Sequence, residues 1–293
     1  MNNLYEFIEY SLLGLLGGGV VALIAVSFVL IYKGTHVMNF AVGEIMMLGA
    51  YLYYAARVTF GLPGIVAFLL AIAMIALVSV VIERLVLRPL SGQPVIAVLM
   101  ATIGMSSIIH GVVEGIWGGD TLDVPALLPR VPLSFGDVMI PGNAIGNFAI
   151  AAILIGAFIA FFRYSKTGIA LRATASDPIT AATMGIDIRY AQRITWILSG
   201  AVGAVAGVLI ASAGGLSPGI AGAALAVFAV IILGGMDSIL GAIVAALIMG
   251  LVESLAVGYV GSKSRDILPY LVVLAILVVR PYGLFGSRDI ERL

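Results

Sequence analysis

Cysteine is absent from the 293 residues, and charged residues make up only 10% of them. Without cysteine the chain has neither a disulfide framework nor a thiolate metal site. A soluble domain carries about 25% charged residues, so a water-exposed surface cannot be built from this composition. The formal net charge is zero, which argues against a nucleic-acid partner because nucleic acids are bound by basic surfaces.

Motifs that would give the chain chemistry of its own are also missing. The sequence has no Gly-x-x-x-x-Gly-Lys-Ser/Thr phosphate-binding loop and no His-Glu-x-x-His zinc motif. Its two histidines, His36 and His110, have no companion at metal-ligand spacing, and we expect both to be interfacial or packed. We therefore predict no catalytic residue, no metal site and no nucleotide site of this kind, in a protein that moves a molecule rather than converting it.

Long apolar segments dominate what is present, since 62% of the residues are hydrophobic and the mean hydropathy is +1.18. A helix needs about 20 mainly apolar residues to cross a membrane. The segment 194–236 is too long for one helix and is interrupted by Gly and Pro at 212–219. The uncharged segments are 10–32, 58–82, 89–113, 138–162, 194–236 and 267–279, and two more, 34–56 and 238–262, each contain one acid.

These segments predict an all-α, polytopic integral membrane protein with about eight or nine transmembrane helices. Residues 1–293 form one transmembrane domain in this prediction, and 36–48 or 220–235 is a broken or re-entrant helix. No Lys or Arg precedes the first apolar segment, which is the wrong flank for a signal peptide. We therefore expect that segment to be retained as a membrane helix.

The placement of lysine and arginine orients the segments, because basic residues resist export. With nine crossings the N-terminus lies outside and the C-terminus in the cytoplasm. The longest outer loop, 114–144, then faces the periplasm and carries four acids. Four basic residues lie outside (Arg57, Arg130, Lys263 and Arg265), and eleven lie inside: Lys33, Arg84, Arg88, Arg163, Lys166, Arg172, Arg189, Arg193, Arg280, Arg288 and Arg292.

The longest polar segment on the predicted cytoplasmic side is 165–190. Its pattern predicts two short helices, 167–175 and 178–184. The second is capped by Ser176 or Asp177, has Pro178 at its first position and stops at Gly185. This helix presents small side chains and fits a cleft on a partner protein. The alternative is a solvated loop between two membrane helices.

Two acids, Glu44 and Glu253, interrupt membrane segments. A charge at mid-span costs about 2.5–3.5 kcal/mol or more, so such a side chain faces the bundle interior, a cavity or a partner. We interpret 39–44 as a broken helix beside a transport pathway; alternatively, Glu44 only accepts hydrogen bonds from freed backbone amides. Glu253 fits a structural role. Hydroxyls in 89–113 either face the pathway or bond back to their own helix. The predicted pathway residues are Asn39, Phe40, Gly43, Glu44, Thr102 and Ser106.

Four parts of the chain, in order, carry a resemblance to one family. The first is LIYK at 30–33 with MNFAVGE at 38–44 and LGAY at 48–51. The second is ER at 83–84 with RPL at 88–90 and ATIG at 101–104, the third begins GIALRA at 168–173, and the last is RPYGLFG at 280–286. The chain resembles the permeases of branched-chain amino-acid ABC importers, in particular the shorter, LivH-type subunit. Val42 stands where that family usually has His.

The resemblance implies an ABC importer permease fold and a set of partners. These are a second, related LivM-type permease, two cytoplasmic ATPase subunits that hold ATP-Mg, a periplasmic solute-binding protein and the lipids of the bacterial inner membrane. The solute is a branched-chain amino acid, or a similar amino-acid or amide solute such as urea. The 165–190 loop becomes the coupling helix on the ATPase, with the docking residues Gly168, Arg172, Ala173, Asp177, Ala181, Ala182 and Gly185.

Two other classes of protein compete with this reading. An ion-coupled secondary transporter would use Glu44 or Glu253 for proton or sodium coupling and would need no ATPase. A channel or a purely structural membrane subunit would need no capped helix on its cytoplasmic side. Co-purification with ATPase subunits separates the importer from both.

Overall fold

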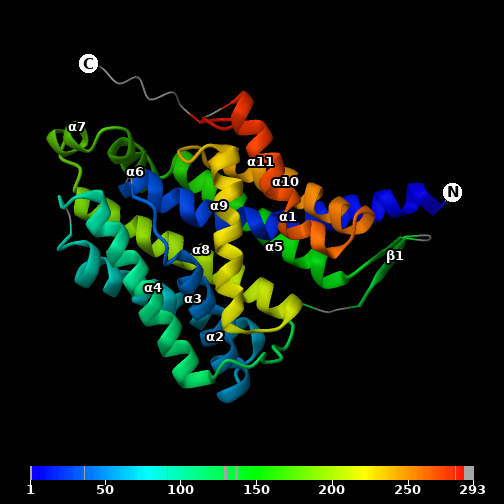
Figure 1. Cartoon of the computed structure of the whole chain (residues 1–293). Helices are drawn as coiled ribbons and strands as arrows, with labels where there is room; N and C mark the ends of the chain where they lie inside the picture. Colours follow the sequence, from blue (N-terminus) through cyan, green and yellow to red (C-terminus); the bar gives the residue numbers. More distant parts are fainter. Residues whose placement is uncertain are drawn as a thin grey trace.

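The structure is a computed structural model that describes residues 2–35, 37–90, 92–128, 131–135, 138–280 and 282–286. His36, Arg130, Arg288 and Arg292, named above, lie outside this part of the chain, as do one of the four acids of the predicted outer loop, Asp137, and the proline of RPYGLFG, Pro281. The described residues form a bundle of helices with one small hairpin at its edge (Figure 1). The α-helices are α1 (Asn2–Thr35), α2 (Val42–Tyr54), α3 (Gly64–Ile82), α4 (Val95–Trp117), α5 (Gly142–Tyr164), α6 (Lys166–Ser176), α7 (Pro178–Thr183), α8 (Ile188–Gly214), α9 (Gly222–Gly234), α10 (Ile239–Tyr259) and α11 (Leu268–Val279).

Six of the described helices are long and apolar enough to cross a membrane: α1, α3, α4, α5, α8 and α10. The other predicted crossings correspond to three shorter apolar segments. The 13 residues of α2 continue into the π-helical turn η1 (Ala55–Thr59), α9 follows the 3-10 turn η3 (Pro218–Ala221), and α11 has 12 residues. At about 1.5 Å per residue, α9 alone spans about 20 Å, less than the roughly 30 Å hydrocarbon layer. The expected mixture of full and broken membrane helices is therefore present.

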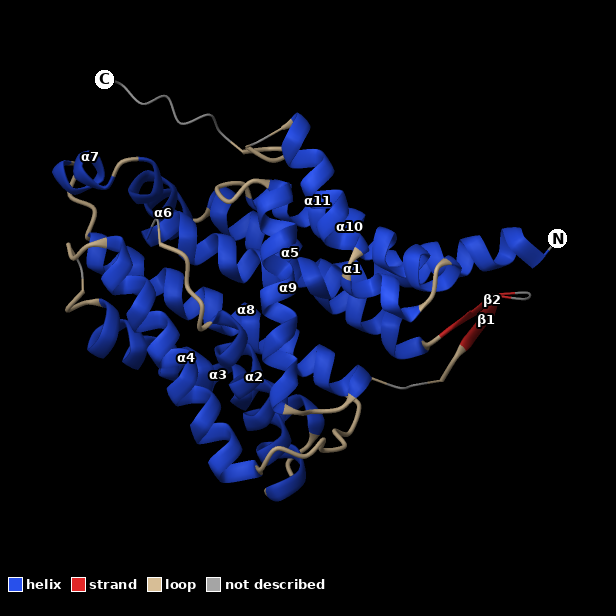
Figure 2. Cartoon of the chain, viewed as in Figure 1, coloured by secondary structure: helices blue, strands red, loops and turns tan. Residues whose placement is uncertain are grey.

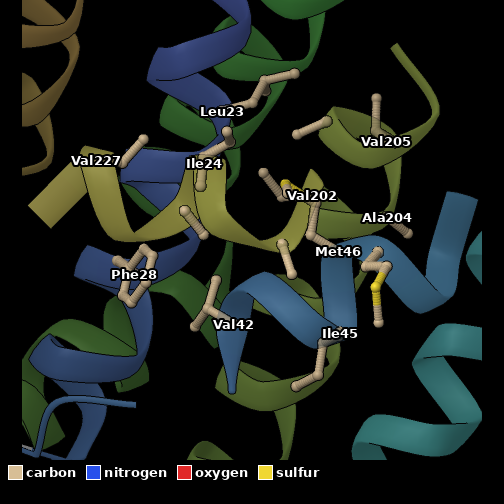
Figure 3. Close-up of a cluster of buried hydrophobic side chains, with 14 of the residues drawn as sticks. Leu23, Ile24, Phe28, Val42, Ile45, Met46, Val202, Ala204, Val205 and Val227 are labelled. Atoms are coloured by element: carbon tan, nitrogen blue, oxygen red, sulfur yellow. The ribbon is translucent and has the colours of Figure 1, made fainter. Parts of the chain in front are cut away.

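Two helices, α1 and α8, form the centre of the bundle and are buried along most of their length, whereas α3, α4 and α5 expose most of theirs. Ser27 of α1 and Ser199 of α8 each donate a hydrogen bond to the other's carbonyl oxygen at 2.9 Å. Such hydroxyl pairs hold membrane helices together where water cannot compete. Figure 3 shows part of the apolar core of the bundle, to which Phe28 of α1, Met46 of α2 and Val227 of α9 all contribute.

Small residues allow α2 to approach α8 closely. A Cβ atom added at Gly49 of α2 would lie 2.7 Å from the Cα atom of Ala204, and one added at Gly207 of α8 would clash with the carbonyl oxygen of Met46. Gly207 belongs to the spacing of small residues at 200–207 that is typical of close helix packing in membranes. This packing fixes the position of α2, which carries Glu44.

Both predicted breaks are present, and the two broken helices meet. The helix α2 begins at Val42 after an irregular segment at 37–41, and α9 begins at Gly222. The Asn39 side chain accepts a hydrogen bond from the backbone N–H of Ala41 at 3.0 Å, which closes the turn that leads into α2. A Cβ atom at Gly43 would lie 2.5 Å from the carbonyl oxygen of Ala221. Glycine at this position therefore lets the first turn of α2 lie against the start of α9.

The break after α8 is held by the loop that follows α4. Leu122 and Leu216 exchange backbone hydrogen bonds of 2.8 and 2.9 Å in an isolated bridge. Residues 215–219 read Gly-Leu-Ser-Pro-Gly, the spacing of a nucleophile elbow. A helix rather than a strand precedes them, so they lack the strand–turn–helix context that such an elbow requires.

The polar loops gather at the two ends of the bundle. We call one end the α7 end: it holds α6, α7 and the turn at 235–238, where the Lys33 ammonium donates a hydrogen bond to the Asp237 carbonyl oxygen at 3.3 Å. The predicted outer loop lies at the opposite end and is shorter than expected, because α4 runs to Trp117 and α5 starts at Gly142. It contains an unpredicted antiparallel hairpin, β1 (Leu133–Phe135) with β2 (Val138–Ile140), which projects from the bundle (Figure 2).

Candidate functional site

A cavity of about 200 Å³ lies where the first turns of α2 and α9 face α4. We call it the Glu44 cavity. Four of the six predicted pathway residues line it: Phe40, Gly43, Glu44 and Ser106. The walls are otherwise apolar and include Phe28, whose ring lies 4.6 Å from that of Phe228. Residues 39–44 and the hydroxyls of α4, which were predicted separately, are therefore brought together in one place.

The carboxylate of Glu44 is held by two side chains of α4. The hydroxyl of Ser106 donates a hydrogen bond to Glu44 Oε1 at 3.2 Å, and His110 Nδ1 lies 3.4 Å from Glu44 Oε2. The other ring nitrogen of His110 lies 3.4 Å from Glu114 Oε1, so the imidazole bridges two carboxylates. His110 was expected to be interfacial or packed and was not counted in the pathway. Its i,i+4 spacing from Glu114 is visible in the sequence, but its contact with Glu44 depends on how α2 packs on α4.

The other two predicted pathway residues, Asn39 and Thr102, line a second cavity of about 250 Å³ at the α7 end, which we call the Glu83 cavity. The hydroxyl of Thr102 donates to the Leu99 carbonyl oxygen at 2.8 Å and accepts from the Phe40 N–H at 3.4 Å. Because Phe40 lines the first cavity, Thr102 lies between the two. Ser107 bonds back to the carbonyl oxygen of Ile103, as the alternative for these hydroxyls predicted. Glu253 lies in α10 and lines neither cavity.

A buried carboxylate closes one wall of the second cavity. Glu83 begins the π-helical turn η2 (Glu83–Leu87), and its side chain is 4% exposed. Its oxygens form ion pairs with Arg88 Nε at 3.9 Å and Arg193 Nε at 3.6 Å, which tie η2 to the start of α8. The sequence does not predict this cluster, because Arg193 is far from Glu83 in the chain.

We expect Glu83→Gln to lower the free energy of unfolding by about 1–3 kcal/mol. Removing one partner of a buried pair costs about 3–5 kcal/mol, and the loss is smaller here because both arginines are about one-third exposed and partly screened. Thermal unfolding of the purified protein in detergent measures the change. Arg84→Gln, an exposed substitution in the same turn, is the control. Equal midpoints for the two variants would contradict this account of Glu83.

The 165–190 loop forms the two helices that its sequence predicts, with ends that differ by one residue. Ser165 caps α6 by accepting from the Gly168 N–H at 2.9 Å, and Asp177 caps α7 by accepting from the N–H groups of Ile179 and Thr180. The Thr180 hydroxyl also donates to Asp177, and these hydrogen bonds, that of the hydroxyl first, lower the pKa of the Asp177 carboxyl. The capping carboxylate is therefore charged at neutral pH, and its contribution is lost only as the pH falls through that lowered pKa.

The seven predicted docking residues do not share one face. Gly168 is buried so close to the end of α5 that an added Cβ atom would clash with the backbone there. Ala181 is only 4% exposed. Both residues therefore pack inward. Asp177 caps α7, and Gly185 turns the chain with a φ of +83°. Arg172 and Ala182 are exposed, and Ala173 is half-buried. A docking role for Gly168 and Ala181 would therefore be indirect, through the shape of the loop.

The exposed face of this loop is more apolar than predicted. Ile179 and Met184, at the two ends of α7, are each 79% exposed, and Ile169 of α6 is 51% exposed. Figure 1 shows α7 at the outer edge of the bundle, away from the central helices. These three side chains make the exposed side of the loop partly apolar, a surface that a partner protein could cover.

Comparisons with known proteins identify the family of the chain. Residues 11–279 match the family described as branched-chain amino acid transport system, permease component. The chain is 28% identical to the high-affinity branched-chain amino acid transport system permease protein BraD of Pseudomonas aeruginosa, with both chains covered completely. It is 29% identical to LivH of Escherichia coli over 98% of this chain and 97% of LivH. A guanosine ABC transporter permease protein, NupQ of Bacillus subtilis, is 27% identical over 86% of this chain and 85% of NupQ.

The family match spans most of the chain and includes both broken helices, the two cavities and the 165–190 loop. It confirms the resemblance seen in the sequence. This chain belongs to the branched-chain amino acid transport system permease family.

Proposed function

We propose that this chain is the membrane permease through which an ATP-driven importer moves branched-chain amino acids, or similar small amino-acid or amide solutes, across the bacterial inner membrane. The observation that carries the proposal is the pair of capped helices α6 and α7, whose exposed apolar side chains Ile179 and Met184 offer a surface to a partner. Together with membership of the permease family, this surface supports energy supplied by separate ATPases that hold ATP-Mg.

The charge distribution supports an N-terminus outside and a C-terminus in the cytoplasm. Basic residues near membrane segments favour the cytoplasmic side. Three of the described basic residues belong to segments toward the opposite end, namely Arg57, Lys263 and Arg265. Nine lie at the α7 end: Lys33, Arg84, Arg88, Arg163, Lys166, Arg172, Arg189, Arg193 and Arg280. In this orientation α6 and α7 face the two cytoplasmic ATPases, and the hairpin β1–β2 faces the periplasmic solute-binding protein.

The transport pathway in this proposal runs past Asn39, Phe40, Gly43, Glu44, Thr102 and Ser106. Side chains at the rim of the Glu44 cavity, Ile103 and Leu225, are 42% and 57% exposed. A second, LivM-type permease would cover this face of α4 and α9 and complete the pathway. The whole chain, 1–293, acts as one transmembrane domain.

Reconstitution separates the importer from an ion-coupled carrier. We expect the chain, co-expressed with its second permease and two ATPases and placed in proteoliposomes with the binding protein, to take up leucine only when ATP is present on the ATPase side. Guanosine is the comparison solute, because the relative NupQ is named as a guanosine ABC transporter permease. Leucine uptake by the chain alone, driven by a proton or sodium gradient, would contradict the proposal.

A further inference from the structure

The Glu44 cavity contains one carboxylate in otherwise apolar surroundings. Of the side chains that line it, only Glu44 and Ser106 are polar. Glu44 is 14% exposed, and its oxygens are contacted by one hydroxyl and one imidazole nitrogen at 3.2 and 3.4 Å. A carboxylate has about four sites at which it can accept hydrogen bonds, so capacity remains on the side that faces the cavity. A carboxylate removed from water is strongly attracted to any positive group that enters.

The apolar walls define the rest of a ligand. Phe28, Phe40, Ile103 and Leu225 all line the cavity, and Ile103 and Leu225 are the more exposed of the four. The volume of about 200 Å³ is below the roughly 300–1,000 Å³ typical of sites for drug-sized molecules. The cavity therefore suits a small aliphatic molecule with one cationic end better than a nucleoside, which is larger and uncharged.

We propose that the Glu44 cavity is a recognition site for the ammonium group of an aliphatic amino acid during its passage, an inference that rests on the proposed function. The ammonium donates hydrogen bonds to the Glu44 carboxylate, and the aliphatic side chain packs between Phe28, Phe40 and Leu225. Selectivity for a cationic amine is then built into the permease itself, in addition to any selection by an external binding protein.

His110 is a positioning residue for this site. Its imidazole lies between the carboxylates of Glu44 and Glu114, so it holds the Glu44 side chain on the α4 side of the cavity. Glu114 is 51% exposed and does not line the cavity. These two acids form a matched pair for experiment: both contact His110, and only one faces the proposed ligand.

The test uses the complete transporter and three small probes. Leucine carries an ammonium and a carboxylate, 3-methylbutylamine lacks the carboxylate, and 4-methylpentanoate lacks the ammonium. We expect leucine and 3-methylbutylamine to raise the apparent Tm of the purified assembly, measured without binding protein, and 4-methylpentanoate to leave it unchanged. Equal shifts with 4-methylpentanoate and 3-methylbutylamine would overturn the proposal.

Two variants test whether the Tm shift comes from Glu44. Glu44→Gln keeps the shape of the side chain and removes its charge. We expect it to abolish the Tm shift caused by 3-methylbutylamine and to slow leucine uptake by at least about tenfold, the scale of a lost charge-assisted hydrogen bond. Glu114→Gln should retain both the Tm shift and the rate of leucine uptake. Glu44→Asp should restore part of the shift because it restores the charge, which separates recognition from a general loss of folding.

The outcomes also distinguish a failure of the ammonium site from a failure of the proposed importer function. If the unmodified assembly shows no ATP-driven leucine uptake, the proposed function fails. If it transports leucine and Glu44→Gln transports leucine equally well, the importer stands and the ammonium site is wrong.

Discussion

Replacing Ile179 by aspartate is expected to weaken the association of the permease with its ATPases about 30-fold. Truncating a hot-spot side chain of a protein interface costs about 2 kcal/mol or more, and each 1.4 kcal/mol is a factor of ten in affinity. The expected loss treats Ile179 as such a hot spot. Ile179 is 79% exposed and belongs to α7, which lies at the outer edge of the bundle (Figure 1). In the proposed complex an ATPase covers this side chain. Co-purification of the ATPases on tagged permease, compared across salt and detergent conditions, measures the loss.

The variant is designed to leave the loop folded. Residue 179 is the second residue of α7, and a carboxylate in the first turn of a helix is stabilised by the helix dipole. The side chain of Ile179 makes no part of the cap, which is formed by its backbone N–H and Asp177. Val131→Asp is the control, because Val131 is 69% exposed near the hairpin at the opposite end.

Ala182→Arg tests the same face with added bulk, since residues 179 and 182 lie on one side of a helix. Ala181→Arg is not equivalent, because Ala181 is buried and the substitution would disturb the packing of the loop itself. Full ATPase binding by both Ile179→Asp and Ala182→Arg would show that α7 is not the docking surface.

The helices of this loop could be predicted because their signals are local. Asp177, Pro178 and Gly185 act within one or two turns of their own positions, through a cap, a fixed φ and a positive φ. The breaks before α2 and α9 were predicted for the same reason, from Asn and Glu in one apolar segment and from Gly and Pro in the other.

The composition of the candidate site could be predicted only in part. Ala181 was predicted to dock because the family resemblance places it in the coupling helix and because its side chain is small. Small residues also pack inward, and only the tertiary arrangement decides between the two. His110 and Glu44 are 66 positions apart, and Glu83 and Arg193 are further apart still. Nothing in a single sequence pairs such residues, since their contact depends on which faces of the helices meet.

Replacing Gly207 by leucine is expected to prevent α2 from packing on α8. A Cβ atom at this position would clash with the backbone carbonyl of Met46, a residue with no exposed surface, so the strain cannot be relieved by moving a side chain alone. Overpacking of a core costs about 1–3 kcal/mol when side chains yield, and we expect the upper end of that range or more here. The apparent Tm in detergent should fall on the order of 10 °C, with a lower yield of monodisperse protein.

Gly156→Leu is the matched control, because Gly156 of α5 has open space where its Cβ atom would lie. Both variants add the same side chain to a membrane helix, so they differ only in what that side chain meets. The comparison matters for function because α2 carries Gly43 and Glu44 to the cavity, and its position there depends on its contact with α8. If Gly207→Leu melts at the same temperature as Gly156→Leu, then α2 does not lie against α8 at this point, and the Glu44 cavity loses the wall that α2 supplies.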